Sequence, residues 1–536
     1  DADATDTTGG YQRGNYATLN PLMNTDGQNI TLANGNLSFT SAASSGQYGT
    51  RVNTIGVTSG KWYAEFTVGA VGNGVFIGIT RDPDGDSNFI GGHATSYGYL
   101  TNGQKYNNNS GSSYGDSYTA GDVISIAMDL DNDTVAFYKN GVSQGTAYNS
   151  LAASTYFMGI SGAVNAAVVA NFGQMRFKYP IPSGYKALNT TALPPATIAD
   201  GSAQFDTKLW TGNGSTQSIT GLSFSPDFVW IKNRSNTADH RVYDTVRGVL
   251  KELPTNDTNA ETTRANSLTA FNSDGFSLGS WGGVNNNNTT AVGWSWNAGS
   301  STVSNTAGDV TSSVRANPSA GFSIVKWTNN GSNTPSSHRW GHGLGVVPDL
   351  VITKRINNTS DWNVYSEVFS NPVRDELYLN TTAAKATAGV DLYHRDNNTV
   401  GIRAGSIGSS GDQHIAYCFA SVAGYSAIGS YTGNGSSNGP FIHTGFKVAF
   451  LLYKRTDSSQ PWYIVDAARD PDNIALALIS PNDNAIEDTG SSGVVDLLSN
   501  GFKPRASFQT VNASGGNYLY MAFAENPFQA NGGLAR

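Results

Sequence analysis

The sequence predicts an all-β protein of several domains, and three observations lead to that prediction. Charged residues make up 13% of the 536 residues, whereas glycine alone accounts for 62. Strong helix formers rarely gather in windows with a 3.6-residue period. The 25 Tyr, 23 Phe and 10 Trp residues stand with β-branched residues in short runs between Gly, Asn and Ser, which is typical of strands and turns. At roughly 150 residues per domain, the chain has room for three or four domains.

Charge and cysteine content exclude several classes of protein. The chain has 32 basic and 40 acidic residues, a net charge of −8, and no basic stripe that could neutralise phosphates, so we expect no nucleic-acid partner. No run of 18 apolar residues occurs, so we expect no membrane insertion. Cys418 is the single cysteine, which excludes a disulfide framework. We expect no cofactor.

The first predicted domain covers residues 11–189 and follows a Thr-, Asp- and Gly-rich tether at residues 1–10. Short alternating runs recur about every ten residues between turn signals, which predicts a β-sandwich. Asn140-Gly141 closes one such run and indicates a hairpin. Pro194-Pro195 then predicts a linker over residues 190–204, because consecutive prolines end strands and stiffen the chain.

Three related repeats follow the linker, at residues 205–300, 301–428 and 429–536. They open with an aromatic residue before a Thr-x-Asn-Gly-Ser sequence, at Trp210, Trp327 and Tyr431. About 20 residues later comes an apolar run that ends in lysine (Lys232, Lys354 and Lys454). Each copy is long enough to be a β-sandwich domain in its own right, unlike the short units of a solenoid.

The three lysines allow two interpretations. They could support an ion pair between repeats, or they could keep strand ends soluble and unpaired with neighbouring strands. The second interpretation is favoured.

The first predicted domain resembles the SPRY domain, the core of the B30.2 family. The resemblance covers about a third of the chain and lies in stretches whose order and spacing agree: Gly60-Lys61-Trp62-Tyr63-Ala64-Glu65-Phe66, Gly74-Val75-Phe76-Ile77-Gly78-Ile79, Tyr97-Gly98-Tyr99, Gly121-Asp122-Val123-Ile124, Phe137-Tyr138-Lys139-Asn140-Gly141 and Ala170-Asn171-Phe172-Gly173-Gln174. It implies a β-sandwich that binds partners through variable loops and is not a catalyst. No individual binding residue carries over.

The three repeats resemble tail-proximal or surface virion proteins of marine bacteriophages. The motifs are the Thr-Gly-Asn-Gly-Ser openings and the closing sequence Met521-Ala522-Phe523-Ala524-Glu525-Asn526-Pro527-Phe528. This resemblance implies a location at the virion surface, with other virion proteins as partners. By analogy with phage appendages, the chain could form a homotrimer.

Paired carboxylates are the first place to look for an enzyme, since a glycosidase needs two of them about 5 to 10 Å apart. Asp82, Asp84 and Asp86 lie in one turn and are secondary candidates for a Ca²⁺ site. Their twelfth position holds His93 instead of an acid, and aspartates beside Gly and Pro usually cap turns. No nucleophile elbow, P-loop or zinc-binding helix motif occurs. We therefore expect a protein that is not an enzyme.

Aromatic rings beside amides are what a sugar-binding site uses, because rings stack on sugar faces while amides bind hydroxyls. Residues of this kind in the SPRY-like domain, and one more in the second repeat, are predicted to bind ligand: Tyr97, Tyr99, Tyr106, Asn107, Asn108, Tyr114 and Trp340. For the aromatic residues that open each repeat, core packing is the favoured alternative.

Together these features predict a non-enzymatic phage virion protein that recognises a host-surface receptor, expected to be a glycan. One alternative is a capsid or tail decoration protein that binds other virion proteins. A second alternative is a polysaccharide depolymerase whose acids come from loops.

Overall fold

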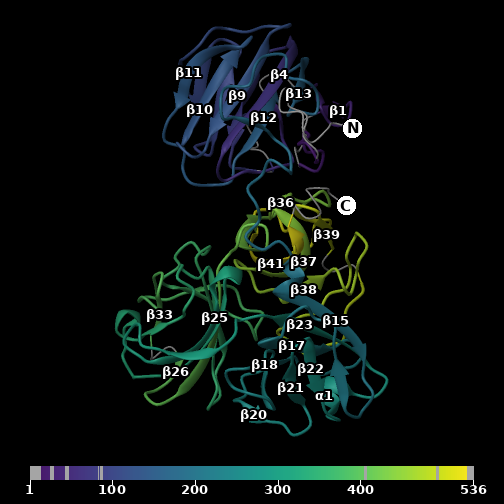
Figure 1. The fold of residues 1–536 in the computed structure, drawn as a ribbon, viewed down its shortest axis with the longest axis vertical. Coiled ribbons are helices and arrows are strands. Elements are labelled where there is room, and N and C mark those ends of the chain that lie inside the picture. The colour runs from purple at the N-terminus through teal and green to yellow at the C-terminus, as the bar shows by residue number, and fades with distance from the viewer. Residues whose placement is uncertain are drawn as a thin grey trace. The chain divides into compact units, whose positions relative to one another are not determined.

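The computed structural model describes residues 14–23, 29–42, 47–82, 84, 89–403, 407–490 and 494–527; the predicted tether at residues 1–10 lies outside them. The chain forms two compact units (Figure 1). Unit 1 comprises residues 1–195, 440–445 and 528–536, and unit 2 comprises residues 196–439 and 446–527. The boundary at residue 195 falls inside the predicted linker. The predicted all-β fold class is confirmed by the strands that dominate both units.

Unit 1 is a sandwich of two sheets whose strands pair antiparallel, except that β14 pairs with β4 in parallel. The first has the order β1-β2-β13-β4-β9-β10-β11, with β14 beside β4, and the second has the order β3-β12-β5-β6-β7-β8. The strands are β1 (Ile30–Ala33), β2 (Ser38–Ser41), β3 (Gly49–Val52), β4 (Lys61–Val71), β5 (Val75–Thr80), β6 (Ser96–Leu100), β7 (Gln104–Asn107), β8 (Ser110–Ser113), β9 (Val123–Asp129), β10 (Thr134–Lys139), β11 (Val142–Tyr148), β12 (Phe157–Gly162), β13 (Ala166–Asn171) and β14 (Lys186–Ala187). Segment 440–445 holds β36 (Ile442–His443).

The second sheet of unit 1 has buried residues on both of its faces. Trp62, Phe66, Ile77 and Tyr99 belong to the core cluster that fills the space between the sheets. The opposite face of the second sheet carries a separate aromatic cluster, in which the Phe76 ring stacks on Phe89 at 4.3 Å. Residues i and i+1 of a strand point to opposite faces. Tyr99 of this sheet therefore lies in the core between the sheets, whereas Tyr106 packs against the separate aromatic cluster.

Unit 2 contains three lobes, one for each repeat. Lobe 1 holds η1 (Gly201–Ala203), β15 (Phe205–Thr211), β16 (Gln217–Ile219), β17 (Phe228–Asn233), β18 (Arg241–Asp244), β19 (Lys251–Pro254), β20 (Thr262–Thr263), β21 (Leu268–Asn272), β22 (Gly275–Leu278), α1 (Gly282–Asn285) and β23 (Thr290–Trp296). Lobe 2 holds β24 (Thr302–Asn305), β25 (Ser312–Asn317), η2 (Pro318–Ala320), β26 (Phe322–Thr328), η3 (Pro335–Ser337), β27 (Arg339–Gly341), β28 (Leu350–Arg355), β29 (Trp362–Ser366), β30 (Asp375–Tyr378), β31 (Ala386–Thr387), β32 (Tyr393–Arg395), β33 (Thr399–Ile402) and β34 (Gln413–Phe419). Lobe 3 holds β35 (Ser426–Thr432), β37 (Phe446–Arg455), β38 (Trp462–Asp466), β39 (Val495–Leu498), β40 (Gly501–Pro504) and β41 (Asn517–Pro527).

The lobes share one sheet order. The sheet runs β15-β23-β17-β18 in lobe 1, β26-β34-β28-β29 in lobe 2 and β35-β41-β37-β38 in lobe 3. Register fixes the equivalent residues: Phe228 pairs with Trp296, Leu350 with Phe419, and Phe450 with Phe523. The sequence repeats are therefore repeats of a sheet, and any residue can be compared with its counterparts in the other lobes.

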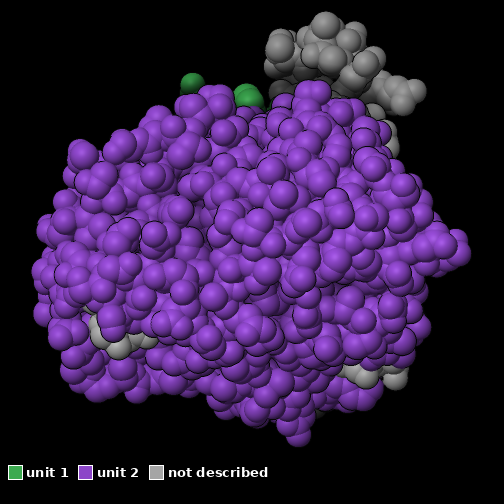
Figure 2. Space-filling model, turned by 90° about the horizontal axis from the view of Figure 1, so that it is seen from below, with its two compact units in different colours: residues 1–195, 440–445, 528–536 green, residues 196–439, 446–527 purple. Residues whose placement is uncertain are grey.

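The three lobes meet at a shared aromatic centre. Trp296, Phe419 and Phe523 occupy equivalent positions, and their ring centroids lie 6.5 Å (Trp296–Phe419), 5.7 Å (Trp296–Phe523) and 6.1 Å (Phe419–Phe523) apart. Each is buried. Three equivalent residues in mutual contact define a pseudo-threefold axis. Figure 2 shows one face of unit 2, formed by residues 196–439 and 446–527. The three lobes thus share a core.

Buried Asp–Arg pairs link the lobes. In lobe 1, Asp244 and Arg247 form an ion pair at 2.5 Å with both side chains fully buried, and the Tyr417 hydroxyl of lobe 2 donates to Asp244 at 2.8 Å. In lobe 3, Asp466 pairs with Arg469 at 2.5 Å, and the indole of Trp294 in lobe 1 donates to Asp466 at 2.9 Å. Tyr417 and Trp294 are equivalent by register.

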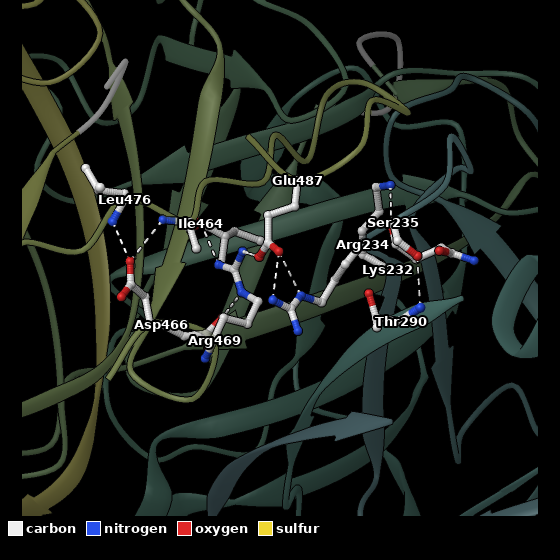
Figure 3. A network of polar contacts seen from close by, with 12 residues as sticks. Lys232, Arg234, Ser235, Thr290, Ile464, Asp466, Arg469, Leu476 and Glu487 are labelled. Carbon is white, nitrogen blue, oxygen red and sulfur yellow. Dashed lines mark hydrogen bonds and ion pairs between the residues drawn. The ribbon is translucent and has the colours of Figure 1, made fainter. Parts of the chain in front are cut away.

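An acidic residue completes each of these two links. Glu261 lies 3.3 Å from Arg247, and Glu487 lies 2.9 Å from Arg469. Figure 3 shows Glu487 between Arg469 and Arg234, and Arg234 contacts Glu487 at 2.7 Å from lobe 1. Glu487 thus holds arginines of two lobes, whereas the ion-pair partners of Glu261 belong to its own lobe.

The junction between lobes 2 and 3 has different chemistry. Equivalent backbone hydrogen bonds join Glu261 to Ile356, Lys385 to Thr456 and Glu487 to Arg234, at 2.8, 2.7 and 2.9 Å, so Lys385 occupies the position of the two glutamates. By register, Ser366 of lobe 2 is equivalent to Asp244 and Asp466. The arginines of lobes 1 and 3 lie three residues after those aspartates, and the residue three positions after Ser366 is Phe369. The link between these lobes is therefore not a carboxylate–arginine pair.

The lysines that end equivalent strands are buried, which corrects the interpretation that they keep strand ends soluble. Lys232, Lys354 and Lys454 are at most 1% exposed. Lys354 Nζ donates to the Thr258 carbonyl of lobe 1 at 2.7 Å, and Lys454 Nζ donates to the Thr382 carbonyl of lobe 2 at 3.3 Å. Burial lowers the pKa of Lys232 to about 8, of Lys354 to about 7 and of Lys454 to about 8, because desolvation disfavours the charged amine. Two of the lysines thus connect lobes through carbonyl oxygens.

No helix within the described ranges is long and apolar enough to cross a membrane.

Candidate functional site

Three half-buried tyrosines surround a lysine at one edge of the unit 1 sandwich. The Tyr97 ring on β6 lies 4.8 Å from the Tyr148 ring on β11. Lys105 Nζ lies 4.9 Å from the Tyr148 ring and 5.8 Å from the Tyr114 ring. We call Tyr97, Lys105, Tyr114 and Tyr148 the tyrosine–lysine face. It joins residues from both sheets, because β6 and β7 belong to the second sheet and β11 to the first.

Hydrogen bonds hold this face in place. Lys105 Nζ donates to the Ala147 carbonyl at 2.6 Å. The Tyr114 hydroxyl accepts from the Phe137 amide at 3.1 Å and donates to the Gly145 carbonyl. Burial raises the pKa of Tyr114 to about 12 and also raises the pKa of Tyr148. Both hydroxyls therefore remain protonated at neutral pH, and hydrogen bonds to the backbone hold Lys105 and Tyr114 in position.

An exposed hairpin lies beside this face. Asn108 and Asn109 connect β7 to β8 with φ values of 51° and 58°, the type I′ geometry that matches the twist of paired strands. Asn108, Asn109 and all of β8 are exposed, whereas Asn107 is half-buried and donates to the Ser96 carbonyl at 2.8 Å. The predicted Asn-rich loop is a tight turn. Of the two asparagines predicted to bind ligand, Asn108 is exposed and can be reached by a partner, whereas Asn107 is half-buried.

Two of the predicted ligand-binding aromatics belong to the core instead of the surface. Tyr99 and Trp340 are fully buried. Tyr99 packs between Phe137 and Tyr118 in the sandwich of unit 1, and Trp340 stacks on Trp327 at 4.4 Å in lobe 2. A ring with no exposed area cannot stack against a sugar, so this part of the prediction is corrected.

Tyr106 lies apart from the other predicted tyrosines. Alternation along β7 turns Tyr106 away from Lys105, and its ring contacts Phe76 at 5.3 Å and Phe89 at 5.8 Å in the separate aromatic cluster. The structure thus brings Tyr97 and Tyr114 together and places Tyr106 on the opposite face of the sheet. The aromatics that open the repeats, Trp210, Trp327 and Tyr431, are 8%, 2% and 8% exposed, which agrees with the packing alternative.

The acidic turn makes one local contact and one long-range contact, in which the Asp84 carboxylate accepts from the Phe441 amide at 3.3 Å. The Asp82 carboxylate accepts from the Asp84 amide at 3.0 Å, the Asx-turn geometry expected of an aspartate that caps its own turn. Asp86 lies outside the described residues. In the part of the chain that the structure describes, no group of three or more His, Cys, Asp or Glu side chains is placed to hold a metal ion.

The single cysteine is buried in lobe 2. Cys418 has no exposed area, and burial raises the pKa of its thiol. A thiol that stays protonated is a poor nucleophile, so Cys418 packs as a small apolar residue.

Lys105 and Tyr148 were missed by sequence reasoning. The signal for Lys105 was its alternation with Tyr106 in a short strand, which puts it on the same face as Asn107. Tyr148 gave no signal of its own, because it lies on β11 in the first sheet, whereas Lys105 lies on β7 in the second.

Unit 1 is a two-sheet β-sandwich, and unit 2 is a three-lobed β body. Comparison with known families agrees with this division. The SPRY domain model matches residues 61–175, and the model of a domain of unknown function, DUF7483, matches residues 200–527. The chain belongs to the DUF7483 family and carries a SPRY domain before it. SPRY domains mediate protein–protein interactions.

Similar proteins match the SPRY part. The ATP-dependent RNA helicase Ddx1 of Drosophila melanogaster is 32% identical over 141 residues, which is 26% of this chain and 19% of the helicase. The E3 ubiquitin-protein ligase RKP of Arabidopsis thaliana is 39% identical over 79 residues, 14% of this chain and 6% of the ligase. The chain therefore spans less than a fifth of either relative. The crystal structure of the SPRY domain of human HERC1 matches with 23% identity and a TM-score of 0.25, covering 28% of this chain and 99% of that domain.

Proposed function

We propose that the chain is a non-enzymatic recognition protein of a phage virion surface, and that its SPRY domain contacts a host-surface receptor. The observation that supports recognition most directly is the tyrosine–lysine face, where fixed rings and a cation stand beside an exposed hairpin. The virion setting rests on the resemblance of the repeat motifs.

The chemistry of the face suits a glycan receptor. Tyrosine rings offer apolar surface for the faces of sugars, and their rigid attachment limits the entropy lost on binding. Asn108 supplies an exposed amide that can both donate to and accept from hydroxyls.

A saturation experiment with host cells tests this proposal. The labelled full chain should attach saturably, and Tyr97→Ala or Lys105→Gln should weaken attachment at least about tenfold. Lys139→Gln is the matched control, because Lys139 Nζ also donates to a backbone carbonyl of unit 1, that of Ser117 at 2.7 Å, and it should attach like the unchanged chain. Equal attachment by all variants would exclude the tyrosine–lysine face as the receptor site.

A second candidate is a decoration protein that binds other virion proteins. The SPRY match favours it, because such domains mediate protein–protein interactions. It predicts stoichiometric association with the capsid or tail and no saturable attachment to host cells.

A further inference from the structure

Lobe 2 contains a cleft lined by charged, polar and apolar side chains. Its volume is about 600 Å³, and its walls come from the segment before β30, the loop before β32, the ends of β32 and β33, and the turn at η3. Three arginines line it, Arg374, Arg395 and Arg403, together with His394 and Asp391. The cleft lies within unit 2 and is distinct from the tyrosine–lysine face of unit 1.

Two of the arginines already have acidic partners. Arg395 forms an ion pair with Glu367. Arg374 contacts Asp391 at 2.8 Å, with the side chains 44% and 55% exposed. An ion pair that exposed contributes little to stability, so Arg374 can exchange Asp391 for another anion at small cost. Arg403 differs from both, because within the described residues no carboxylate lies within 4.0 Å of its guanidinium.

The pseudo-threefold symmetry allows Arg403 to be compared with the equivalent residues of the other lobes. The amides of Gly279, Arg403 and Arg505 make equivalent backbone hydrogen bonds, each 2.8 Å long, to Ser267, Leu392 and Val494. Arg505 of lobe 3 is therefore the counterpart of Arg403.

In lobe 3 the counterpart arginine is neutralised. Arg505 pairs with Asp496 at 3.0 Å, and Asp496 lies two residues after Val494. The residue two positions after Leu392 is His394, so lobe 2 has a histidine where lobe 3 has the carboxylate. His394 lies 3.4 Å from Asp396, and its side chain is 34% exposed. Arg403 is thus left to interact with an anion supplied from outside.

One wall of the cleft is polar and uncharged. Asn333, Thr334 and Ser336 line it and are exposed, so hydroxyl and amide groups face the arginines. One unneutralised guanidinium suits one carboxylate or sulfate, and the polar wall suits sugar hydroxyls. A densely charged polymer such as a nucleic acid fits poorly, because Asp391 and the net charge of −8 oppose it.

We propose that this cleft binds an acidic saccharide, with its carboxylate or sulfate on Arg403 and its hydroxyls against the polar wall. Bidentate contact with a planar guanidinium favours these oxyanions. The site stands on unit 2 and goes beyond the receptor contact proposed for the SPRY domain, so neither depends on the other.

Calorimetric titration of the full chain tests the proposal. The probes are trigalacturonate, which carries carboxylates, a trisaccharide whose only acidic groups are sulfates, and trigalactose, which has no acidic group. At least one acidic probe should bind and trigalactose should not, and comparison of the two acidic probes distinguishes carboxylate from sulfate. Arg403→Gln should weaken binding at least about tenfold, whereas Arg505→Gln, the matched variant in lobe 3, should leave it unchanged.

A second variant keeps the result interpretable if Arg403→Gln disturbs folding. His394→Asp introduces the carboxylate found in lobe 3, so it should neutralise Arg403 and abolish binding of the acidic probe while preserving the thermal midpoint. The proposal is overturned if neither acidic probe binds, if Arg403→Gln and Arg505→Gln lose equal affinity, or if a tri-glutamate peptide binds as tightly as the saccharides. Loss of host attachment by variants of the tyrosine–lysine face would leave these titrations unchanged, so the two proposals fail separately.

Discussion

The Tyr417 hydroxyl of lobe 2 donates a 2.8 Å hydrogen bond to the Asp244 carboxylate of lobe 1, which is also paired with Arg247. Trp294 and Asp466 repeat this relationship between lobes 1 and 3 with different donor chemistry. The repeats have diverged in sequence while keeping one position that reaches the neighbouring lobe. Junctions of this kind are where the stability of unit 2 can be tested most specifically.

Tyr417→Phe removes the inter-lobe hydrogen bond and keeps the ring. We expect a loss of about 1.5 to 3 kcal/mol in the free energy of unfolding, because the acceptor is charged and buried. Urea denaturation of the full chain, followed by tryptophan fluorescence, measures it. Tyr378→Phe is a suitable control, because the Tyr378 hydroxyl contacts Glu376 within its own lobe. A Tyr417→Phe variant as stable as the unchanged chain would contradict the role given to this bond.

Asp244→Ala should be more harmful than Tyr417→Phe. Arg247 is fully buried and would lose its closest carboxylate, and a buried ion pair broken on one side typically costs about 3 to 5 kcal/mol. Asp391→Ala breaks an exposed ion pair and should cost less than about 1 kcal/mol. Similar losses in the two variants would show that the Asp244–Arg247 pair is not a structural link.

The buried lysines predict that unit 2 becomes more stable as the pH rises from 7 to 9. Their pKa values lie near 7 to 8 in the folded chain and near 10.4 when unfolded. Between those values the unfolded chain binds more protons than the folded chain, so the free energy of unfolding increases with pH. Conversely, the free energy of unfolding decreases as the pH drops from 9 to 7, until the buried amines become charged in the folded chain as well.

We expect a gain of about 1 to 2 kcal/mol per lysine over that range. Thermal unfolding at pH 7 and pH 9 measures it. Lys354→Met, which cannot titrate, should reduce the difference between the two pH values. Stability that is flat or falling from pH 7 to 9 would contradict the pKa shifts.

Phe523→Ala tests whether the lobes share one core. Removal of a buried phenylalanine costs about 3 to 5 kcal/mol, and Phe523 touches both Trp296 and Phe419. Hydrogen exchange should therefore accelerate in all three lobes and not in lobe 3 alone. Phe66→Ala, in the core of unit 1, should leave exchange in unit 2 unchanged.

The sequence predicted the all-β fold class, because strand alternation and turn residues are local signals. The shared centre could not be predicted, since nothing local shows that Trp296, Phe419 and Phe523 meet. The burial of Lys232, Lys354 and Lys454 was missed for the same reason: their carbonyl partners include residues of other lobes. The same limit applies to Lys105 and Tyr148, which two different sheets bring together, and to Tyr99, whose burial depends on the packing of both sheets.

Gold labelling of intact particles with an antibody against unit 2 tests the proposed function most directly. The proposal predicts label on the tail or its fibres, where a protein that recognises a host receptor must stand. Label spread evenly over the capsid would contradict the recognition proposal and favour decoration, and particles without label would contradict the virion location itself.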